Sequence, residues 1–285
     1  MRHLLFVIGC LLTVSPVLAQ TGSVLDDLSL QSTILDSERM YAVYLPPDYD
    51  ASARSYPVLY LLHGAGDDHT GWVQFGEVAH IADTAIRDGS ATPMIIVMPD
   101  AQTGQRGYFN SIDGSWRYED FFFEEFIPHV ESTFRIRATK EFRAVSGLSM
   151  GGGGSLIYAM HRPDMFSASA PLSAYVGPLT ESDMRRMMAA ETANLDDEAI
   201  AAYFDRHQAL RLAESVSAED LNTVRWYIDC GDDDFLFEGN SLLHIALTKR
   251  QVRHEYRVRD GGHSWTYWRT SLPDVLAFVT QGFHR

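Results

Sequence analysis

Five short, mostly apolar runs constrain the fold of this chain more than any other feature. They cover residues 57–62, 94–98, 142–145, 166–172 and 224–230. Continuous apolar runs are typical of strands that are covered on both faces, as in a parallel sheet. Helical stretches separate the runs and cover residues 71–87, 118–134, 152–160 and 240–250. This alternation predicts right-handed crossovers and a mostly parallel, doubly wound α/β sheet flanked by helices.

Two segments depart from this alternation. Polar and apolar residues alternate over 29–35 and 39–45, on either side of Asp36-Ser37-Glu38, which predicts an antiparallel hairpin at the sheet edge. Residues 178–222 contain no strand-like run, and we expect two or three helices there. They form either a cap or ordinary surface helices, since scaffolds tolerate long insertions without function. A hydrophobic content of 46% in 285 residues suits one domain, from residue 20 to residue 285.

The first 19 residues are typical of a secretory signal peptide. Arg2 and His3 precede an apolar run over residues 4–14, and Val17-Leu18-Ala19 supplies a small-residue cleavage site. We expect cleavage after Ala19 and a secreted or periplasmic protein. A membrane anchor is the alternative, but the run is too short to span a bilayer, which requires about 20 residues.

The predicted signal peptide also determines which cysteines the mature chain keeps. The segment before Cys10 resembles a lipoprotein cleavage site, but few apolar residues precede it for a signal peptide. Removal of the signal leaves Cys230 as the single cysteine, so no intramolecular disulfide can form. Cys230 lies in an apolar run, which favours a buried and unreactive thiol.

The charge of the chain limits its partners. It has 38 acidic residues against 23 Lys and Arg, a formal net charge of -15, and no basic cluster. Nucleic acids and anionic membranes attract basic surfaces, so the balance argues against both as partners.

Ser149 is the candidate nucleophile. It lies at the centre of Gly147-Leu148-Ser149-Met150-Gly151, between the apolar run at 142–145 and a helical stretch that starts with glycines. The side chain of a nucleophilic serine must project from a tight turn between strand and helix, and small neighbouring residues allow that turn. The alternative is a glycine-rich turn without chemistry.

A serine nucleophile needs a histidine as base and an acid that orients the histidine. His263 is the candidate base, because Asp260-Gly261-Gly262 follows the last strand and lets the loop curl toward the serine. The other histidines after Ser149, apart from His284, lie in probable helices, in the insertion or at a strand start. These are His161, His207, His244 and His254.

The acid should follow the strand at 224–230, where three aspartates stand together: Asp232, Asp233 and Asp234. Spacing alone does not choose among them, and Asp229 lies within the strand itself. The oxyanion of the reaction needs two backbone N–H donors. Met150 supplies one because it follows the nucleophile, and Ala65, with Gly64 as the alternative, supplies the other from the loop after the first parallel strand.

These residues resemble the esterase D-like "putative esterase" family, which includes feruloyl and acetyl xylan esterases, S-formylglutathione hydrolases and mycolyltransferases. The resemblance extends from about residue 30 to the C-terminus. It rests on Tyr60-Leu61-Leu62-His63-Gly64, Trp72, residues 119–134, Ser146-Gly147-Leu148-Ser149-Met150-Gly151-Gly152, Gly231-Asp232-Asp233-Asp234-Phe235-Leu236 and Gly262-His263-Ser264-Trp265-Thr266-Tyr267-Trp268.

The resemblance implies an α/β-hydrolase fold and hydrolysis of carboxylic esters without a cofactor or metal. The family's Gly-x-x-Asp-Phe pattern falls on Gly231, Asp234 and Phe235, which implies Asp234 as the acid. The chain also lacks a histidine pair at helical metal-binding spacing. Asp67-Asp68-His69 is better interpreted as a loop that caps the following helix.

Export favours small extracellular esters or acylated oligosaccharides as substrates, and argues against glutathione thioesters, which are chiefly intracellular. Four aromatic residues could form a pocket for an acyl or aromatic group, or could be core: Trp72, Trp116, Tyr108 and Phe109. Two other functions use the same fold. An acyltransferase would replace water with a sugar hydroxyl, and a non-catalytic binding module would lack a reactive serine.

Overall fold

The computed structural model describes residues 21–101, 107–193 and 195–283. The proposed signal peptide and its cleavage site lie outside these residues. Within them, no helix is both long enough and apolar enough to cross a membrane.

A single eight-stranded sheet runs through the molecule in the order β1-β2-β4-β3-β5-β6-β7-β8. The strands are β1 (Ser23–Ser32), β2 (Ser37–Leu45), β3 (Val58–Leu62), β4 (Ile95–Pro99), β5 (Arg143–Leu148), β6 (Ala168–Leu172), β7 (Arg225–Gly231) and β8 (His254–Arg259). β1 and β2 pair antiparallel, and β2 joins β4 antiparallel. All other neighbours are parallel. The prediction of a mostly parallel sheet with an N-terminal hairpin is confirmed.

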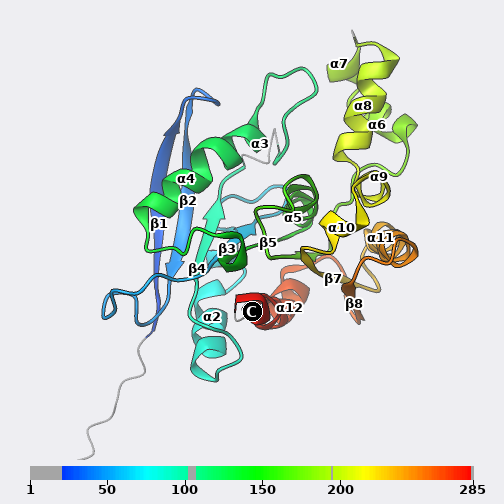
Figure 1. Cartoon of the computed structure of the whole chain (residues 1–285). Coiled ribbons are helices and arrows are strands. Elements are labelled where there is room, and N and C mark those ends of the chain that lie inside the picture. The colour runs from blue at the N-terminus through cyan, green and yellow to red at the C-terminus, as the bar shows by residue number, and fades with distance from the viewer. Residues whose placement is uncertain (1–20, 102–106, 194, 284–285) are drawn as a thin grey trace, which may run out of the picture.

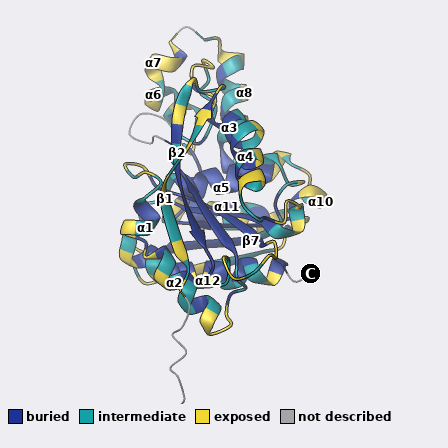
Figure 2. Ribbon diagram, turned by 90° about the vertical axis from the view of Figure 1, so that its left-hand side faces the viewer, coloured by how far each residue is buried: buried dark blue, intermediate teal, exposed yellow. Residues whose placement is uncertain are grey.

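Helices cover both faces of the sheet (Figure 1). They are α1 (Gly71–Gln74), α2 (Val78–Arg87), α3 (Tyr118–Phe121), the π-helical turn η1 (Phe122–Phe126), α4 (Ile127–Thr133), the short 3-10 turn η2 (Lys140–Phe142), α5 (Met150–His161), α11 (Phe237–Lys249) and α12 (Trp265–Phe283). Val58, Tyr60 and Leu62 point into one core and Leu59 and Leu61 into the other, which is the two-residue period of a strand buried on both faces. Figure 2 shows the central strands buried throughout.

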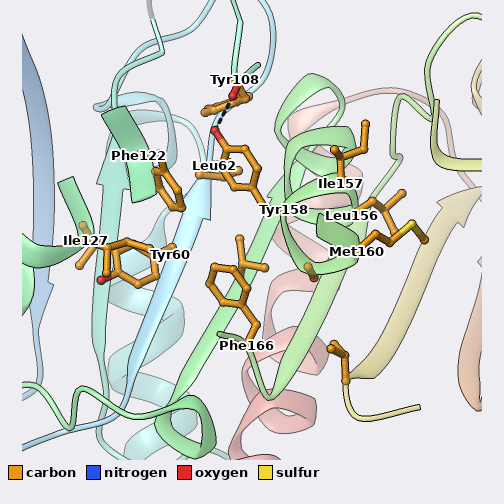
Figure 3. Close-up of a cluster of buried hydrophobic side chains, with 14 of the residues drawn as sticks. Tyr60, Leu62, Tyr108, Phe122, Ile127, Leu156, Ile157, Tyr158, Met160 and Phe166 are labelled. Carbon is orange, nitrogen blue, oxygen red and sulfur yellow. Dashed lines mark hydrogen bonds between the residues drawn. The ribbon is translucent and has the colours of Figure 1, made fainter. Parts of the chain in front are cut away.

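The first core contains most of the large aromatic side chains. Tyr158 of α5 stacks on Phe122, and its hydroxyl donates to the carbonyl oxygen of Tyr108 (Figure 3). Tyr60 of β3 packs edge-on against the Phe122 ring. These contacts hold α5, which carries Ser149 at its start, against the sheet.

Three predicted boundaries were wrong. The first strand spans Ser23–Ser32 rather than 29–35, because its pairing with β2 shifts register between Leu25 and Leu28 and so bypasses two aspartates. The predicted helix at 71–87 is interrupted between α1 and α2, where Glu77 has a left-handed backbone with φ 53°. No helix was predicted after His263, where α12 begins at Trp265.

In the described residues of the insertion at 178–222 there are five helices, where two or three were expected. They are α6 (Glu181–Met187), α7 (Ala189–Thr192), α8 (Asp197–His207), α9 (Ala209–Ser215) and α10 (Ala218–Leu221). Side chains of Thr180, Asp196, Gln208 and Ser217 each cap a helix start, which explains the division into short helices. Figure 1 shows α6, α7 and α8 lying together away from the sheet.

Candidate active site

Ser149 lies on the sharp turn between β5 and α5. Its φ of 55° and ψ of −116° form a conformation that a non-glycine residue adopts only under strain. A Cβ on Gly147 would lie 2.5 Å from the Gly151 carbonyl oxygen, and a Cβ on Gly151 would lie 2.5 Å from that of His63. Both glycines are therefore required by close backbone approach. The turn presents the Ser149 hydroxyl at the carboxyl-terminal edge of the parallel strands.

Ser149, His263 and Asp234 form a continuous series of hydrogen bonds. Ser149 Oγ lies 2.9 Å from His263 Nε2, and His263 Nδ1 lies 2.8 and 3.0 Å from the two Asp234 oxygens. An ionised carboxylate can only accept, so Nδ1 carries the ring proton and Nε2 accepts from the serine hydroxyl. This is the arrangement that a histidine base needs in order to remove the serine proton.

The surroundings of Asp234 keep its carboxylate ionised. Its side chain has no exposed surface, and Oδ1 accepts a hydrogen bond from the Leu236 amide at 2.8 Å. Burial alone would raise the pKa of Asp234. Hydrogen bonds from His263, Leu236 and the Ser173 hydroxyl outweigh burial and hold this pKa below its ordinary value.

The two neighbouring aspartates have different contacts. Asp232 accepts a hydrogen bond from the Gly261 amide at 3.1 Å, and the Asp233 amide donates to the Gly261 carbonyl oxygen at the same distance. These contacts hold the loop that precedes His263. Asp229, within β7, bonds the Tyr227 hydroxyl at 2.9 Å and forms an ion pair with Arg259. Of these four acids, Asp234 is the one that contacts His263.

The other candidate histidines are hydrogen-bonded elsewhere. Nδ1 of His161 lies 2.6 Å from a Glu119 oxygen, and Nδ1 of His207 lies 3.0 Å from the Tyr203 carbonyl oxygen. His244 and His254 bond each other at 2.7 Å.

The two proposed oxyanion donors lie on either side of Ser149. Met150 is the first residue of α5, and Ala65 lies in the turn that follows β3. A Cβ on Gly64 would lie 3.6 Å from the Ser149 Cβ, so this turn approaches the serine closely. Binding of the oxyanion by the Ala65 and Met150 amides stays a prediction.

His63 supports the same turn, a contact that the sequence analysis missed. Its Nδ1 donates to the Gly64 carbonyl oxygen at 2.9 Å, and its Nε2 accepts from the Ala101 amide at 3.1 Å. Burial lowers the pKa of His63, which favours this neutral tautomer. A histidine in the run Leu62-His63-Gly64 was the available signal, but its partner at Ala101 depends on the tertiary fold.

The four aromatic residues considered for a pocket do not all lie in the same surroundings. Trp72 and Tyr108 are 0% exposed, with Trp72 Nε1 donating to the Leu62 carbonyl oxygen and the Tyr108 hydroxyl to that of His63. Trp116 is buried and stacks on Tyr118. These three side chains are core residues that line no described cavity, which is the core alternative that the sequence left open. Phe109 does line a cavity.

Two cavities lie at the base of the insertion. An apolar one of about 160 Å³ is lined by aromatic and methionine side chains, chiefly Phe109, Tyr175, Met184, Met187, Met188 and Tyr203. A second, of about 390 Å³, includes Phe235, Leu236 and the charged groups of Asp183, Arg186 and Glu238.

Tyr175 lines both cavities and connects them to the serine, because its amide donates to the Ser149 carbonyl oxygen at 2.9 Å. Phe235 is 75% exposed, and its ring lies 4.5 Å from that of His263 between centroids. The second cavity therefore lies beside the candidate base, and the first is connected to the serine through Tyr175.

Potential ligands for a metal are limited to one exposed group within the described residues. The carboxylates of Asp232, Asp233 and Asp260 lie within 4.8 Å of one another. Exposed acidic side chains of this kind are not by themselves evidence of a metal site. Asp68 accepts from the Thr70 amide and hydroxyl at 2.7 Å, consistent with a loop that precedes α1. Cys230 is buried, and burial raises the pKa of its thiol to about 12.

Comparison with known proteins gives several related sequences. An esterase of Mycobacterium tuberculosis is 39% identical over 271 residues, which cover 82% of this chain and 55% of that protein. An endo-1,4-beta-xylanase/feruloyl esterase of Xylanibacter ruminicola is 37% identical over 133 residues, 44% of this chain and 18% of that protein. The chain thus spans about half or less of these relatives.

Solved structures extend the comparison to the whole fold. A ferulic acid esterase is 35% identical, with a TM-score of 0.81 over 92% of this chain and 99% of that one. An S-formylglutathione hydrolase from Staphylococcus aureus, 22% identical, has the same fold with a TM-score of 0.71 over 91% of this chain and 98% of the other. The family model described as "Putative esterase" matches residues 32–279. The chain belongs to this family and has the α/β-hydrolase fold.

Proposed function

We propose that this protein is a serine hydrolase of carboxylic esters that acts through an acyl-enzyme. The observation that supports it most directly is the uninterrupted hydrogen bonding from Ser149 through His263 to Asp234. The strained backbone of Ser149 and membership of an esterase family agree with this role.

The reaction begins when His263 Nε2 takes the Ser149 proton as Oγ attacks the ester carbonyl carbon. Asp234 stabilises the imidazolium that forms, and the Met150 and Ala65 amides bind the oxyanion. The intermediate collapses, the alcohol leaves with the proton held by His263, and an acyl-serine remains. Water, deprotonated by the same histidine, then attacks the acyl carbon and releases the acid.

The substrate class in this proposal is an acylated saccharide or a small acyl or aromatic ester. A solved relative named ferulic acid esterase supports it, as do the two cavities beside Tyr175. An apolar cavity of about 150 Å³ can accept a benzene ring, and the smaller cavity has a similar volume of about 160 Å³. Export with cleavage after Ala19 belongs to the same proposal, and the N-terminal sequence of the protein recovered from producing cells tests it.

The direct test is replacement of Ser149 by alanine. We expect Ser149→Ala to lower kcat for p-nitrophenyl acetate by at least about 10⁴-fold while the protein stays folded, because the nucleophile is lost. Ser132→Ala is the matched control, since Ser132 is an exposed serine of α4 whose hydroxyl bonds the His129 carbonyl oxygen. Activity that survives in folded Ser149→Ala would disprove the proposed nucleophile.

Rates with acetyl, butyryl and feruloyl esters then test the substrate class. Feruloyl esters should be hydrolysed with the highest kcat/KM if the apolar cavity receives the aromatic group. Equal rates across the series would argue against that assignment while leaving the esterase activity itself established.

A further inference from the structure

Three tryptophans form an edge-to-face row that ends at His263. Trp72 contacts Trp265 with ring centroids 5.2 Å apart, and Trp265 contacts Trp268 at 5.3 Å. Trp268 then lies against the His263 imidazole at 4.9 Å, with the two ring planes at 90°. The row therefore runs from the helix after β3 to the candidate base.

The indole N–H of Trp268 is hydrogen-bonded. Its Nε1 donates to the hydroxyl of Ser173 at 3.0 Å, and both side chains are buried. Ser173 follows β6 directly and has a left-handed backbone with φ 45°, while its amide donates to the Asp229 carbonyl oxygen at 2.7 Å. A buried hydroxyl held in a strained backbone position indicates that the surrounding fold fixes its direction.

Within the described part of the chain, the other aromatic ring in contact with the imidazole is that of Phe235, which is largely exposed. The loop before His263 contains Gly261, with φ 138°, and Gly262, so the backbone alone restricts the ring little. The direction of the ring must come from its buried neighbours.

We propose that Trp268 and Ser173 are positioning residues that hold the His263 imidazole in line between Asp234 and Ser149. This inference rests on the proposed hydrolase function. Trp268 packs against the ring, and Ser173 accepts the hydrogen bond that fixes Trp268. Neither residue touches the reacting atoms, so both should affect the chemical step rather than substrate binding.

The test is a double-mutant cycle with Trp268→Phe, Ser173→Ala and the double variant, each as the full protein. Each single variant removes the same hydrogen bond and should lower kcat for p-nitrophenyl acetate about 10-fold, with KM changed by less than about 2-fold. The double variant should also lose about 10-fold rather than about 100-fold, because the bond can be lost only once. Either single variant that folds, as judged by circular dichroism, tests the proposal alone.

Trp226→Phe is the matched control, since Trp226 is a buried tryptophan of β7 whose Nε1 donates to the Leu221 carbonyl oxygen at 2.8 Å. It should lower Tm and leave kcat unchanged. If Trp268→Phe and Ser173→Ala behave in that way, or if their effects on kcat multiply, the positioning role is wrong. If the wild-type protein hydrolyses no ester, the proposed function itself fails, and the two failures are thus distinct.

Discussion

Replacing Glu119 by glutamine would remove a buried carboxylate that joins three helices. Glu119 lies on α3, His161 at the end of α5, and His207 at the end of α8 in the insertion. One Glu119 oxygen lies 2.6 Å from His161 Nδ1, and the other lies 3.8 Å from His207 Nε2. His161 Nε2 also lies 2.8 Å from the Arg206 carbonyl oxygen, so both of its nitrogens contact oxygen atoms.

The pKa of Glu119 gives the size of the effect. Burial would raise it, but the hydrogen bond with His161 and the proximity of the His207 ring lower it from 4.5 to about 2. The difference between these two pKa values corresponds to about 3 kcal/mol of stability. Since the pKa is lower in the folded state, this contribution is complete above pH 4.5 and is lost as the pH falls toward 2.

The assay is urea unfolding of the wild type and Glu119→Gln at pH 6 and pH 3. The wild type should lose about 2 kcal/mol more than the variant between these pH values, because the remainder of the contribution persists until about pH 2. All other carboxylates are common to both proteins and cancel in the difference. Glu198→Gln, an exposed position on α8, should follow the wild type. Identical pH slopes for wild type and Glu119→Gln would refute the argument.

Two further predictions concern the candidate triad and its turn. Asp234→Asn should lower kcat for p-nitrophenyl acetate by about 10⁴-fold with little change in Tm, because the amide no longer fixes the ring tautomer; a loss below 10-fold would remove Asp234 as the acid. Gly151→Ala should lower the free energy of unfolding by about 3 kcal/mol, since the new Cβ would lie 2.5 Å from the His63 carbonyl oxygen. Alanine normally stabilises a helix by about 1 kcal/mol over glycine, so a more stable variant in urea unfolding would contradict the predicted clash.

The parallel sheet was predictable because burial on both faces leaves continuous apolar runs in the sequence. The breaks within the helical stretches could not be predicted from the sequence. Glu77 adopts φ 53° between α1 and α2, yet nothing in its residue type requires a left-handed backbone. The register shift between Leu25 and Leu28 likewise depends on how β1 meets β2 in the folded protein.

The members of the candidate triad were accessible to sequence analysis because each lies in a short local pattern. The choice among the three aspartates needed the family resemblance, and the structure then placed Asp234 beside His263. The walls of the site were less accessible, since aromatic residues fill cores and line pockets alike. Trp72 illustrates this limit, because it lies buried in the row of tryptophans instead of facing a cavity.

The connection between the sheet and the insertion explains how substrate choice could vary while the chemistry stays fixed. Residues 173–176 leave β6 and are held on several sides: the Tyr175 amide bonds the Ser149 carbonyl oxygen, the Asn240 side chain bonds both backbone groups of Ala174, and the Val176 carbonyl accepts from Ala209. The Tyr175 side chain instead lines both cavities, and its hydroxyl contacts Met187 of α6. The backbone of this segment is therefore hydrogen-bonded to Ser149, whereas the Tyr175 side chain forms part of the cavity walls. Substitutions in α6 can reshape the cavities without moving Ser149, because the hydrogen bonds to the backbone of this segment come from Ser149, β7, α9 and α11.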